Sequence, residues 1–539
     1  MKTIHPIEFE IFKNLYLSIA EEMGVTLCRT SFSPNIKERL DYSCAVYDAQ
    51  GETIAQGDHL PVHLGAMPLS VRAAIDSGPL APGDTVALND PFQGGTHLPD
   101  ITLVTPVFLK QGTRTGSQPT FYVANRAHHS DVGGMSPGSM PVANEIFQEG
   151  LIIPPIKLVR GGKIVPDLLA LILANVRTPD EREGDLTAQL ASNQVAVQRL
   201  QHAAAKYGRR SLVAYGAALQ DHTEKVMRAT IRQIPAGVYE FEDALDNDGF
   251  SNQPIPIRAR LTIAGDQAEI DFTGSAPQVA GSVNANYAVT LSACLYAFRC
   301  LVREEVLYNA GVARTLKVVA PPGTIVNALR PAAVAGGNVE TSQRITDVVF
   351  GALAQALPAI IPAASQGTMN NLTLGGTDPR TGKRFAYYET MAGGMGGRNG
   401  LPGLSGVQTH MSNTRNTPVE ALEHYLPLRI RRYRLRQGSG GEGQYPGGEG
   451  VVREYEMLTD TSVTILTDRR VRPPYGASGG KPGGLGRNTL IRGQKAKKLP
   501  GKLQLKLRPG ERLCIETPGG GGYGLKSSTA LNHPPEPKH

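Results

Sequence analysis

The sequence has no tryptophan, few cysteines and no long apolar run. Its five cysteines are scattered and never spaced as C-x-x-C: Cys28, Cys44, Cys294, Cys300 and Cys514. This usage indicates neither a disulfide framework nor a thiolate metal site. No apolar stretch approaches the roughly 18 residues of a membrane helix, and no signal pattern opens the chain. We therefore expect a cytoplasmic protein that does not span a membrane.

Nucleotide and nucleic-acid motifs are also lacking. The stretch GSGGEG at 438–443 matches GxGxxG, but Gln444-Tyr445-Pro446 follows where a helix should begin. The net charge of +7 is partly local, in the basic segments 429–436 and 495–498, and no RNA motif or zinc-finger spacing accompanies it. We interpret the basic segments as solvated surface or as a face toward an acidic partner, not as a nucleic-acid site. If the chemistry uses ATP, another chain binds it.

With 539 residues, 61 of them glycine and 39 proline, the chain is too long for one core and favours many turns and short strands. Helical spacing covers 5–30 and most of 166–235, and alternation begins near 237. We predict an α+β, multidomain fold with mixed sheets, helices and a Gly-rich, strand-rich C-terminal region. The predicted units are a metal-site α/β domain (1–235), an antiparallel β domain with a helix (236–325), an α/β substrate-loop domain (326–430), a Gly-rich β domain (431–525) and a disordered tail (526–539).

Two clusters of His and Asp lie at the ends of one predicted hairpin. His97 and Asp100 precede the β-branched run 101–108, and His128, His129 and Asp131 follow the run 121–124. Pairing these strands would bring both clusters to one end of a sheet, where imidazole and carboxylate groups can bind a divalent transition metal. The alternative is that these are solvated or hydrogen-bonded loop side chains.

Other polar residues have weaker signals. His59 and His63 are four apart, but Pro61 between them excludes the helical two-His zinc motif, so we interpret them as loop or packing residues. Glu340, Arg344 and Asn413 lie in polar, Gly-flanked loops. We hypothesise that one of these three binds a substrate carboxylate or phosphate; the alternative is that they cap helices and turns.

Several ordered blocks together resemble the hydantoinase B/oxoprolinase family. The resemblance spans roughly residues 4–525, and many blocks in the same order make it specific. The blocks are NDPFQGGTHLPD, NRAHHSDVGG, GGNVETSQR, SQGTMNN, HMSNTRNTPVE, GSGGEGQYPGGEG and PGGGGYG.

The resemblance implies a ligand set. Asp41, His97, Asp100 and His128 match the family's metal ligands, and Asp41 would otherwise be an ordinary residue at the start of a strand. His129 and Asp131 would then be catalytic groups that orient ligands or move protons. The metal implied is zinc or manganese.

The resemblance also implies an activity. A hydantoinase A-type subunit would use ATP and magnesium to phosphorylate the carbonyl oxygen of a small cyclic amide, and a metal-bound water in this B subunit would attack the activated carbon. The expected enzyme is thus a hetero-oligomeric, ATP-dependent cyclic amide hydrolase that opens 5-oxoproline or a hydantoin. The alternatives are a subunit of an ATP-dependent ketone carboxylase and a non-catalytic scaffold for the A subunit.

Overall fold

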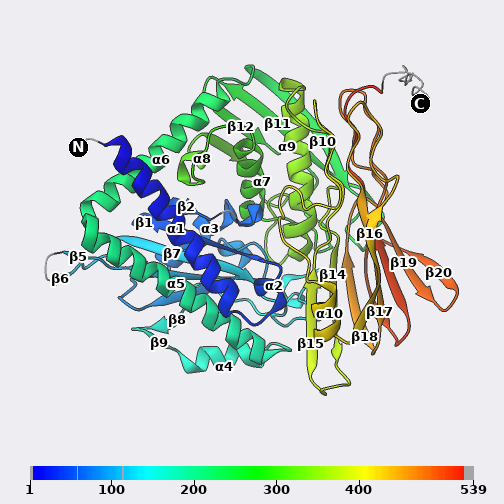
Figure 1. Cartoon of the computed structure of the whole chain (residues 1–539), viewed down its shortest axis with the longest axis horizontal. Helices are drawn as coiled ribbons and strands as arrows, with labels where there is room; N and C mark the ends of the chain where they lie inside the picture. Colours follow the sequence, from blue (N-terminus) through cyan, green and yellow to red (C-terminus); the bar gives the residue numbers. More distant parts are fainter. Residues whose placement is uncertain (1–3, 58, 112–113, 527–539) are drawn as a thin grey trace, which may run out of the picture.

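The computed structural model describes residues 4–526 except 58, 112 and 113. Helices and several mainly antiparallel sheets build an elongated molecule, with the N-terminal half at one end and the C-terminal sheets at the other (Figure 1). The predicted α+β, multidomain fold class is confirmed. The predicted tail lies outside the described residues except for Lys526.

A seven-stranded antiparallel sheet forms the first layer. Its strands, in spatial order, are β2 (Thr53–Gln56), β1 (Tyr42–Asp48), β7 (Phe121–His128), β4 (Asp100–Val107), β3 (Thr85–Leu88), β8 (Ile156–Arg160) and β9 (Lys163–Ile164). A short ribbon of β5 (Lys110–Gln111) and β6 (Arg114–Thr115) extends beyond β4. The predicted hairpin is therefore the central pair β4–β7, and every residue of both strands is buried.

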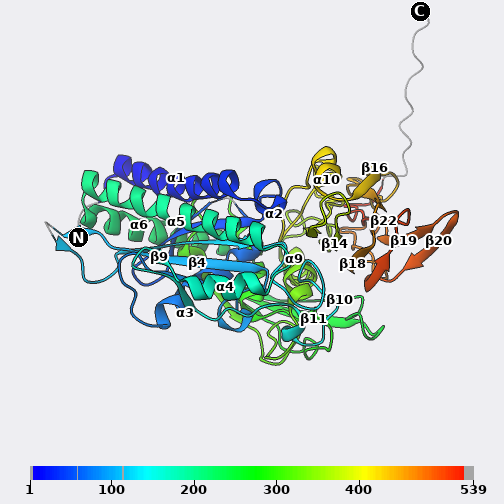
Figure 2. The ribbon, with the colours of Figure 1, turned by 90° about the horizontal axis from the view of Figure 1, so that it is seen from below.

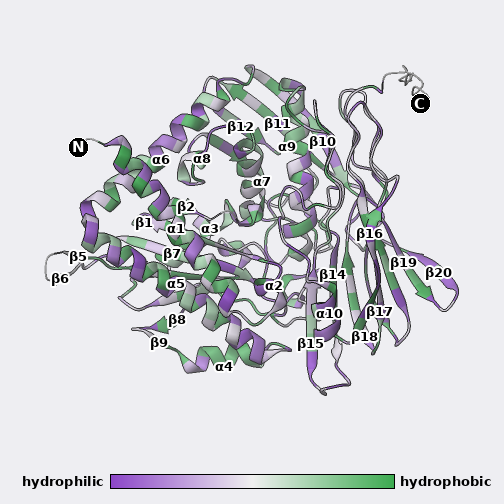
Figure 3. Ribbon diagram, in the orientation of Figure 1, coloured by the Kyte–Doolittle hydropathy of each residue, from purple (hydrophilic) through white to green (hydrophobic). Residues whose placement is uncertain are grey.

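Three long helices cover one face of this sheet (Figure 2). They are α1 (Pro6–Thr30), α5 (Pro179–Tyr207) and α6 (Arg209–Ile231). In α1 the residues Phe12, Tyr16, Ile19, Met23 and Leu27 recur every three or four positions, so they form one stripe that packs on β1, β2 and β7. Purple and green segments alternate along these helices in Figure 3, as such a stripe requires.

Shorter helices complete this half. They are α2 (Pro34–Lys37), α3 (Ala66–Asp76) and α4 (Pro166–Ala174), with single turns η1 (Pro61–His63), η2 (Pro91–Gln93) and η3 (Ile146–Gln148). Helix α3 packs on the opposite face of the sheet through Met67, Val71 and Ala74.

The next layer combines a four-stranded sheet with helices. The strands are β10 (Gly237–Leu245), β11 (Ile255–Ala264), β12 (Gln267–Asp271) and β13 (Leu316–Val319), and β12–β13 is a parallel pair. The helices are α7 (Tyr287–Arg299), α8 (Ala310–Ala313) and α9 (Ser342–Ala356), preceded by one turn of π-helix, η4 (Gly337–Thr341). Buried residues of α7, α9, β11 and β12 share one hydrophobic core.

Two sheets stack around a further core at the C-terminal end. One contains β15 (Arg384–Glu389), β14 (Asn371–Thr377), β18 (Thr461–Leu466) and β21 (Lys502–Leu507). The other contains β16 (Leu428–Arg436), β17 (Gly450–Met457), β22 (Arg512–Glu516), β19 (Arg487–Arg492) and β20 (Lys495–Leu499), with α10 (Val419–Tyr425) against β16. Because β14 pairs with β18, strands from both sides of the predicted boundary at 430/431 share one sheet.

The glycine-rich segments pack backbone against backbone. A Cβ on Gly448 would lie 1.9 Å from the carbonyl oxygen of Leu404, and one on Gly520 would lie 2.1 Å from that of Met395. Gly520 also donates its amide to Gly448 O. Only glycine permits such approach, so the segment 438–443 is a structural loop of this kind. Among the described residues no helix has the length and apolarity needed to cross a membrane.

Candidate metal centre

The register of the β4–β7 pair sets the geometry of the centre. Asp100 is the first residue of β4 and pairs with His128, the last residue of β7. His97 lies in the turn before β4, where Asp100 N donates to His97 O at 3.1 Å. Pro99 keeps this turn out of a helix, and its carbonyl accepts from His129 N at 2.8 Å. Both predicted clusters therefore meet at one end of the sheet.

His97, Asp100 and His128 bring one ligand atom each to within 4.8 Å of one another, and all three are buried. Asp100 Oδ1 lies 3.1 Å from His97 Nε2 and 3.2 Å from His128 Nδ1. Ligand atoms around a tetrahedral ion with bonds near 2.0–2.1 Å are separated by roughly 3.3 Å. The observed separations match that spacing.

The second oxygen of Asp100 is held from behind. Thr96 Oγ1 donates to Oδ2 at 2.5 Å, and His63 Nε2 lies 3.2 Å from the same atom. His63 Nδ1 in turn contacts Ser43 Oγ at 2.8 Å. These contacts fix the plane of the carboxylate and leave Oδ1 directed at the two histidines.

A side chain from a distant segment closes the cluster. Asn338, in the π-helical turn η4, has its Nδ2 3.2 Å from His97 Nε2. A Cβ on Gly337 would lie 1.8 Å from the carbonyl oxygen of Asn284, so glycine is required for the turn to reach this depth. π-Helical turns are frequent at functional sites.

Asp41 lies beside the cluster. Its carbonyl accepts from His128 N at 3.0 Å, and its buried carboxylate is 3.8 Å from Arg39 Nη1. Arg39 also lies over the Tyr388 ring at 5.0 Å, and that ring stacks on His128 at 4.4 Å. The His128 imidazole is thus clamped between its ladder partner and an aromatic face.

Burial and mutual contacts set the protonation of these groups. Burial alone would raise the pKa of Asp100, but His97, His128 and His63 around it hold that pKa well below its ordinary value. Burial lowers the pKa of His128 and of His63 despite their contacts with Asp100. For Asp41, burial raises the pKa, and His128 and Arg39 act in the opposite direction. Near neutral pH the cluster therefore offers neutral imidazoles and an ionised Asp100, the forms that bind metals.

The residues present fit a divalent ion. Besides the converging donors, His97 Nδ1 and His128 Nε2 are buried with no hydrogen-bond partner among the described residues. Orphaned buried polar atoms of this kind are what an absent ion or water leaves behind. A set of imidazole nitrogens and carboxylate oxygens suits zinc, manganese and iron.

Comparisons with known proteins place the chain in a family. The model of the hydantoinase B/oxoprolinase family matches residues 5–526. The chain belongs to this family. The resemblance predicted from the sequence blocks is therefore confirmed.

Individual relatives differ in length. An uncharacterized protein of Methanocaldococcus jannaschii is 43% identical over 532 residues, which are 98% of this chain and 92% of the relative. 5-Oxoprolinase 1 of Arabidopsis thaliana is 40% identical over 550 residues, which are 96% of this chain but only 42% of that longer protein. The crystal structure of an ATP-dependent caprolactamase from Pseudomonas jessenii superposes with a TM-score of 0.89 at 29% identity, covering 97% of this chain and 92% of the other.

In this hydantoinase B/oxoprolinase chain, His129 and Asp131 face away from the cluster. His129 Nε2 contacts Gln189 Oε1 of α5 at 2.9 Å, and burial lowers the pKa of His129 to about 4. Asp131 accepts from the backbone amide of Gly133 and from Arg177 Nη1, at 3.1 and 2.9 Å. Their observed contacts thus secure α5 and a loop.

The three predicted substrate-binding residues lie in different surroundings. Buried Glu340 accepts from Met369 N and Asn371 Nδ2, and burial raises its pKa to about 7. Arg344 is committed to an internal ion-pair network, as its guanidinium contacts Asp243 Oδ2 at 2.6 Å and Asp468 Oδ1 at 3.0 Å.

Asn413 is exposed and lines a cavity of about 480 Å³. Its Nδ2 donates to His59 O at 2.9 Å. Of the three predicted residues it is the one that borders an open space as the structure has it.

Sequence reasoning missed His63 and Asn338. His63 was interpreted as a packing residue because Pro61 breaks the helical motif, but the turn η1 aims its ring at Asp100 instead. The remark that applies to Asn338 is different: only the Gly336-Gly337 pair before it signals a close approach, and that pair names no partner.

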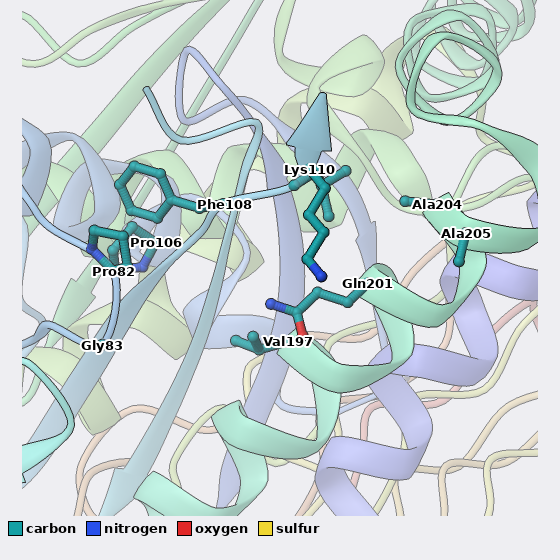
Figure 4. Close-up of a pocket in the computed structure, with 10 residues that line it drawn as sticks. Pro82, Gly83, Pro106, Phe108, Lys110, Val197, Gln201, Ala204 and Ala205 are labelled. Carbon is teal, nitrogen blue, oxygen red and sulfur yellow. The ribbon is translucent and has the colours of Figure 1, made fainter. Parts of the chain in front are cut away.

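The largest cavity, about 660 Å³, lies elsewhere, between α5 and the end of β4 (Figure 4). Figure 4 shows Lys110 and Gln201 on its opposite sides, with Phe108 and Pro106 on one wall. Its described lining contains no His, Asp or Glu. This cavity therefore offers no groups for the chemistry expected of the cluster.

Proposed function

We propose that this chain is the metal-binding subunit of an ATP-dependent cyclic amide hydrolase that opens 5-oxoproline or a hydantoin. The observation that carries the proposal is the convergence of His97, Asp100 and His128 in a chain of the hydantoinase B/oxoprolinase family. The similarity to a 5-oxoprolinase and to an ATP-dependent caprolactamase supports a lactam-type substrate.

The chemistry of a cyclic amide explains why both ATP and a metal are needed. Resonance makes the amide carbonyl a poor electrophile, and phosphorylation of its oxygen turns the centre into an imidate-like group with a good leaving group. A divalent ion supplies Lewis acidity and lowers the pKa of water toward neutrality. His97, Asp100, His128 and Asp41 would hold that ion.

The protein's own groups orient the reaction. His63 and Thr96 fix Asp100, and Tyr388 fixes the plane of His128. Asn338 presents an amide next to His97, where it can donate to an oxygen of the substrate. Because all of these side chains except the partly exposed surroundings of Asn413 are buried, bulk water is kept from the activated centre.

We propose that ATP and magnesium are bound by a separate subunit of the hydantoinase A type. This chain corresponds to 42% of 5-oxoprolinase 1, so the remainder of that relative has no counterpart here. A caprolactamase chain of similar length is ATP-dependent. A second chain would therefore supply the phosphorylating activity, which makes a hetero-oligomer.

The deciding experiment is ATP-dependent ring opening by the chain together with its ATP-binding subunit. We expect hydrolysis of 5-oxoproline or hydantoin in the presence of a divalent metal, and none from His97→Ala. ATP consumption with turnover only when bicarbonate and a ketone are added would replace the proposal with a carboxylase. Unchanged activity of His97→Ala would instead point to a scaffold.

A further inference from the structure

A second cleft opens beside the metal centre. It consists of two adjoining cavities of about 480 and 420 Å³, which share Cys300, Leu301, Ile360 and Arg398. The cleft lies between the C-terminal ends of α7 and α9 and the loops 359–365, 395–401 and 408–413. Nothing derived above assigns a ligand to it.

The charge of the cleft has one sign. Its lining includes Arg303 and Arg398 but no Asp or Glu; Glu304 and Glu305, next to Arg303 in the chain, do not line either cavity. Among the described residues neither arginine forms an ion pair with a carboxylate. Cationic clefts with low-dielectric walls concentrate anions, and guanidinium groups bind carboxylate and phosphate through paired hydrogen bonds.

One wall of the cleft is made of rings. Phe350 lies 6.2 Å from Tyr296 and 5.3 Å from His410, measured between ring centroids. His410 has a φ of +57°, which is unusual for a residue with a side chain and places the imidazole on this wall. Burial lowers the pKa of His410 to about 4, so the ring is neutral near pH 7. The wall suits a small flat ring.

Two segments connect the cleft to the metal centre. The Asn413 amide on the cleft donates to His59 O, and four residues later His63 contacts Asp100. The same loop continues to Thr414, whose Oγ1 lies 3.4 Å from Arg39 Nη2. Occupation of the cleft is therefore felt by residues that support the cluster.

We propose that this cleft binds an anionic ring compound: a cyclic amide that carries a carboxylate or a phosphate. Arg303 and Arg398 bind the anionic group, and the ring packs on Tyr296, Phe350 and His410. The identity of the ring rests on the proposed function, whereas the selection for an anion rests on the cleft alone.

The test is ligand binding to the isolated full-length chain, without ATP or partner, by isothermal titration. The probes are 5-oxoproline, caprolactam as a neutral lactam, and inorganic phosphate as a competitor. We expect saturable binding of 5-oxoproline, with at least about tenfold weaker binding of caprolactam, since loss of one paired charge contact has this order of effect. Competition by phosphate would assign the site to the phosphate of an activated substrate as well as to a carboxylate.

Variants locate the site. The double variant Arg303→Gln, Arg398→Gln should lose at least about tenfold in affinity for 5-oxoproline, and Arg398→Lys should retain more of it than Arg398→Gln. Arg434→Gln removes an exposed arginine on β16 and serves as the matched control. Phe350→Leu should weaken the ring contact while leaving phosphate binding unchanged.

Equal affinities of the double variant and the wild type would overturn the proposal, as would equal binding of caprolactam and 5-oxoproline. Ring opening by the complex is measured separately. Anion binding without ring opening would contradict the proposed function and leave the cleft assignment standing. Ring opening with an unchanged KM in the double variant would contradict the cleft and leave the function standing.

Discussion

Asp100 faces His128 across the terminal residue pair of the β4–β7 ladder, with Asp100 Oδ1 3.2 Å from His128 Nδ1. Directly opposed residues of an antiparallel pair have neighbouring side chains on one face, and a slip of one residue would send one of them to the other face. The turn before β4 adds His97 at 3.1 Å. The candidate metal centre is therefore a consequence of strand register, and register is fixed by the buried runs on both strands.

Removal of one of the clustered donors should release the metal. We expect His97→Ala and Asp100→Asn to contain little bound metal and to show no ring opening, because one of three converging donors is lost. His202→Ala, an exposed histidine of α5, is the control and should keep both properties. Elemental analysis of the purified chain measures the metal. Full metal content in Asp100→Asn would show that the ion binds elsewhere.

His63 should act through Asp100. Its Nε2 contacts Asp100 Oδ2 and its Nδ1 contacts Ser43, so His63→Ala frees the carboxylate to rotate. We expect metal affinity to fall by about 10–100-fold, the usual cost of losing a group that orients a ligand. Titration of metal-free protein measures this. A drop in melting temperature with unchanged affinity would instead support the packing role that the sequence suggested.

Local patterns predicted the elements that carry the cluster. Apolar residues at helical spacing identified α1, and β-branched runs with a polar Gly/Pro connection identified the β4–β7 hairpin. Because the clusters sit at the ends of that hairpin, their convergence could also be deduced. Asp41 came only from the family resemblance, since a carboxylate at the start of a strand has no distinguishing pattern of its own.

Long-range contacts could not be predicted from local patterns. Asn338 reaches His97 from 241 residues away, and β14 pairs with β18 across a boundary where the composition changes. Arg344 shows the same limit: a polar loop residue in sequence, it turns out to lie in a buried network with Asp243 and Asp468. Packing partners of this kind are chosen by the tertiary fold.

The Arg344 network makes a prediction that separates structure from substrate binding. Arg344→Gln leaves Asp243 and Asp468 without a buried partner, and breaking such a pair costs about 3–5 kcal/mol. We expect a clearly lower melting temperature. An unchanged KM in the surviving folded protein would count against the substrate-binding role hypothesised from the sequence. Arg380→Gln, which removes an exposed local pair with Asp378, should leave the melting temperature nearly unchanged.

Glu149 should make stability depend on pH. Burial raises its pKa from 4.5 to about 8, although its Oε1 accepts from the amides of Val334 and Ala335 at 2.9 Å each. The folded chain therefore keeps a proton that the unfolded chain releases above pH 4.5. This contribution to stability is fully present below pH 4.5 and is lost as the pH rises through about 8.

Glu149→Gln keeps the shape of the neutral acid but cannot ionise. We expect the melting temperature of the wild type to fall by a few degrees more than that of Glu149→Gln between pH 6 and pH 9, because only the wild type must ionise a buried group. Differential scanning fluorimetry over this range measures the difference. Glu145→Gln, an exposed residue of the same loop, is the control and should follow the wild type. Parallel curves for all three proteins would show that Glu149 is already ionised in the fold, and that the amides of Val334 and Ala335 suffice to stabilise its charge.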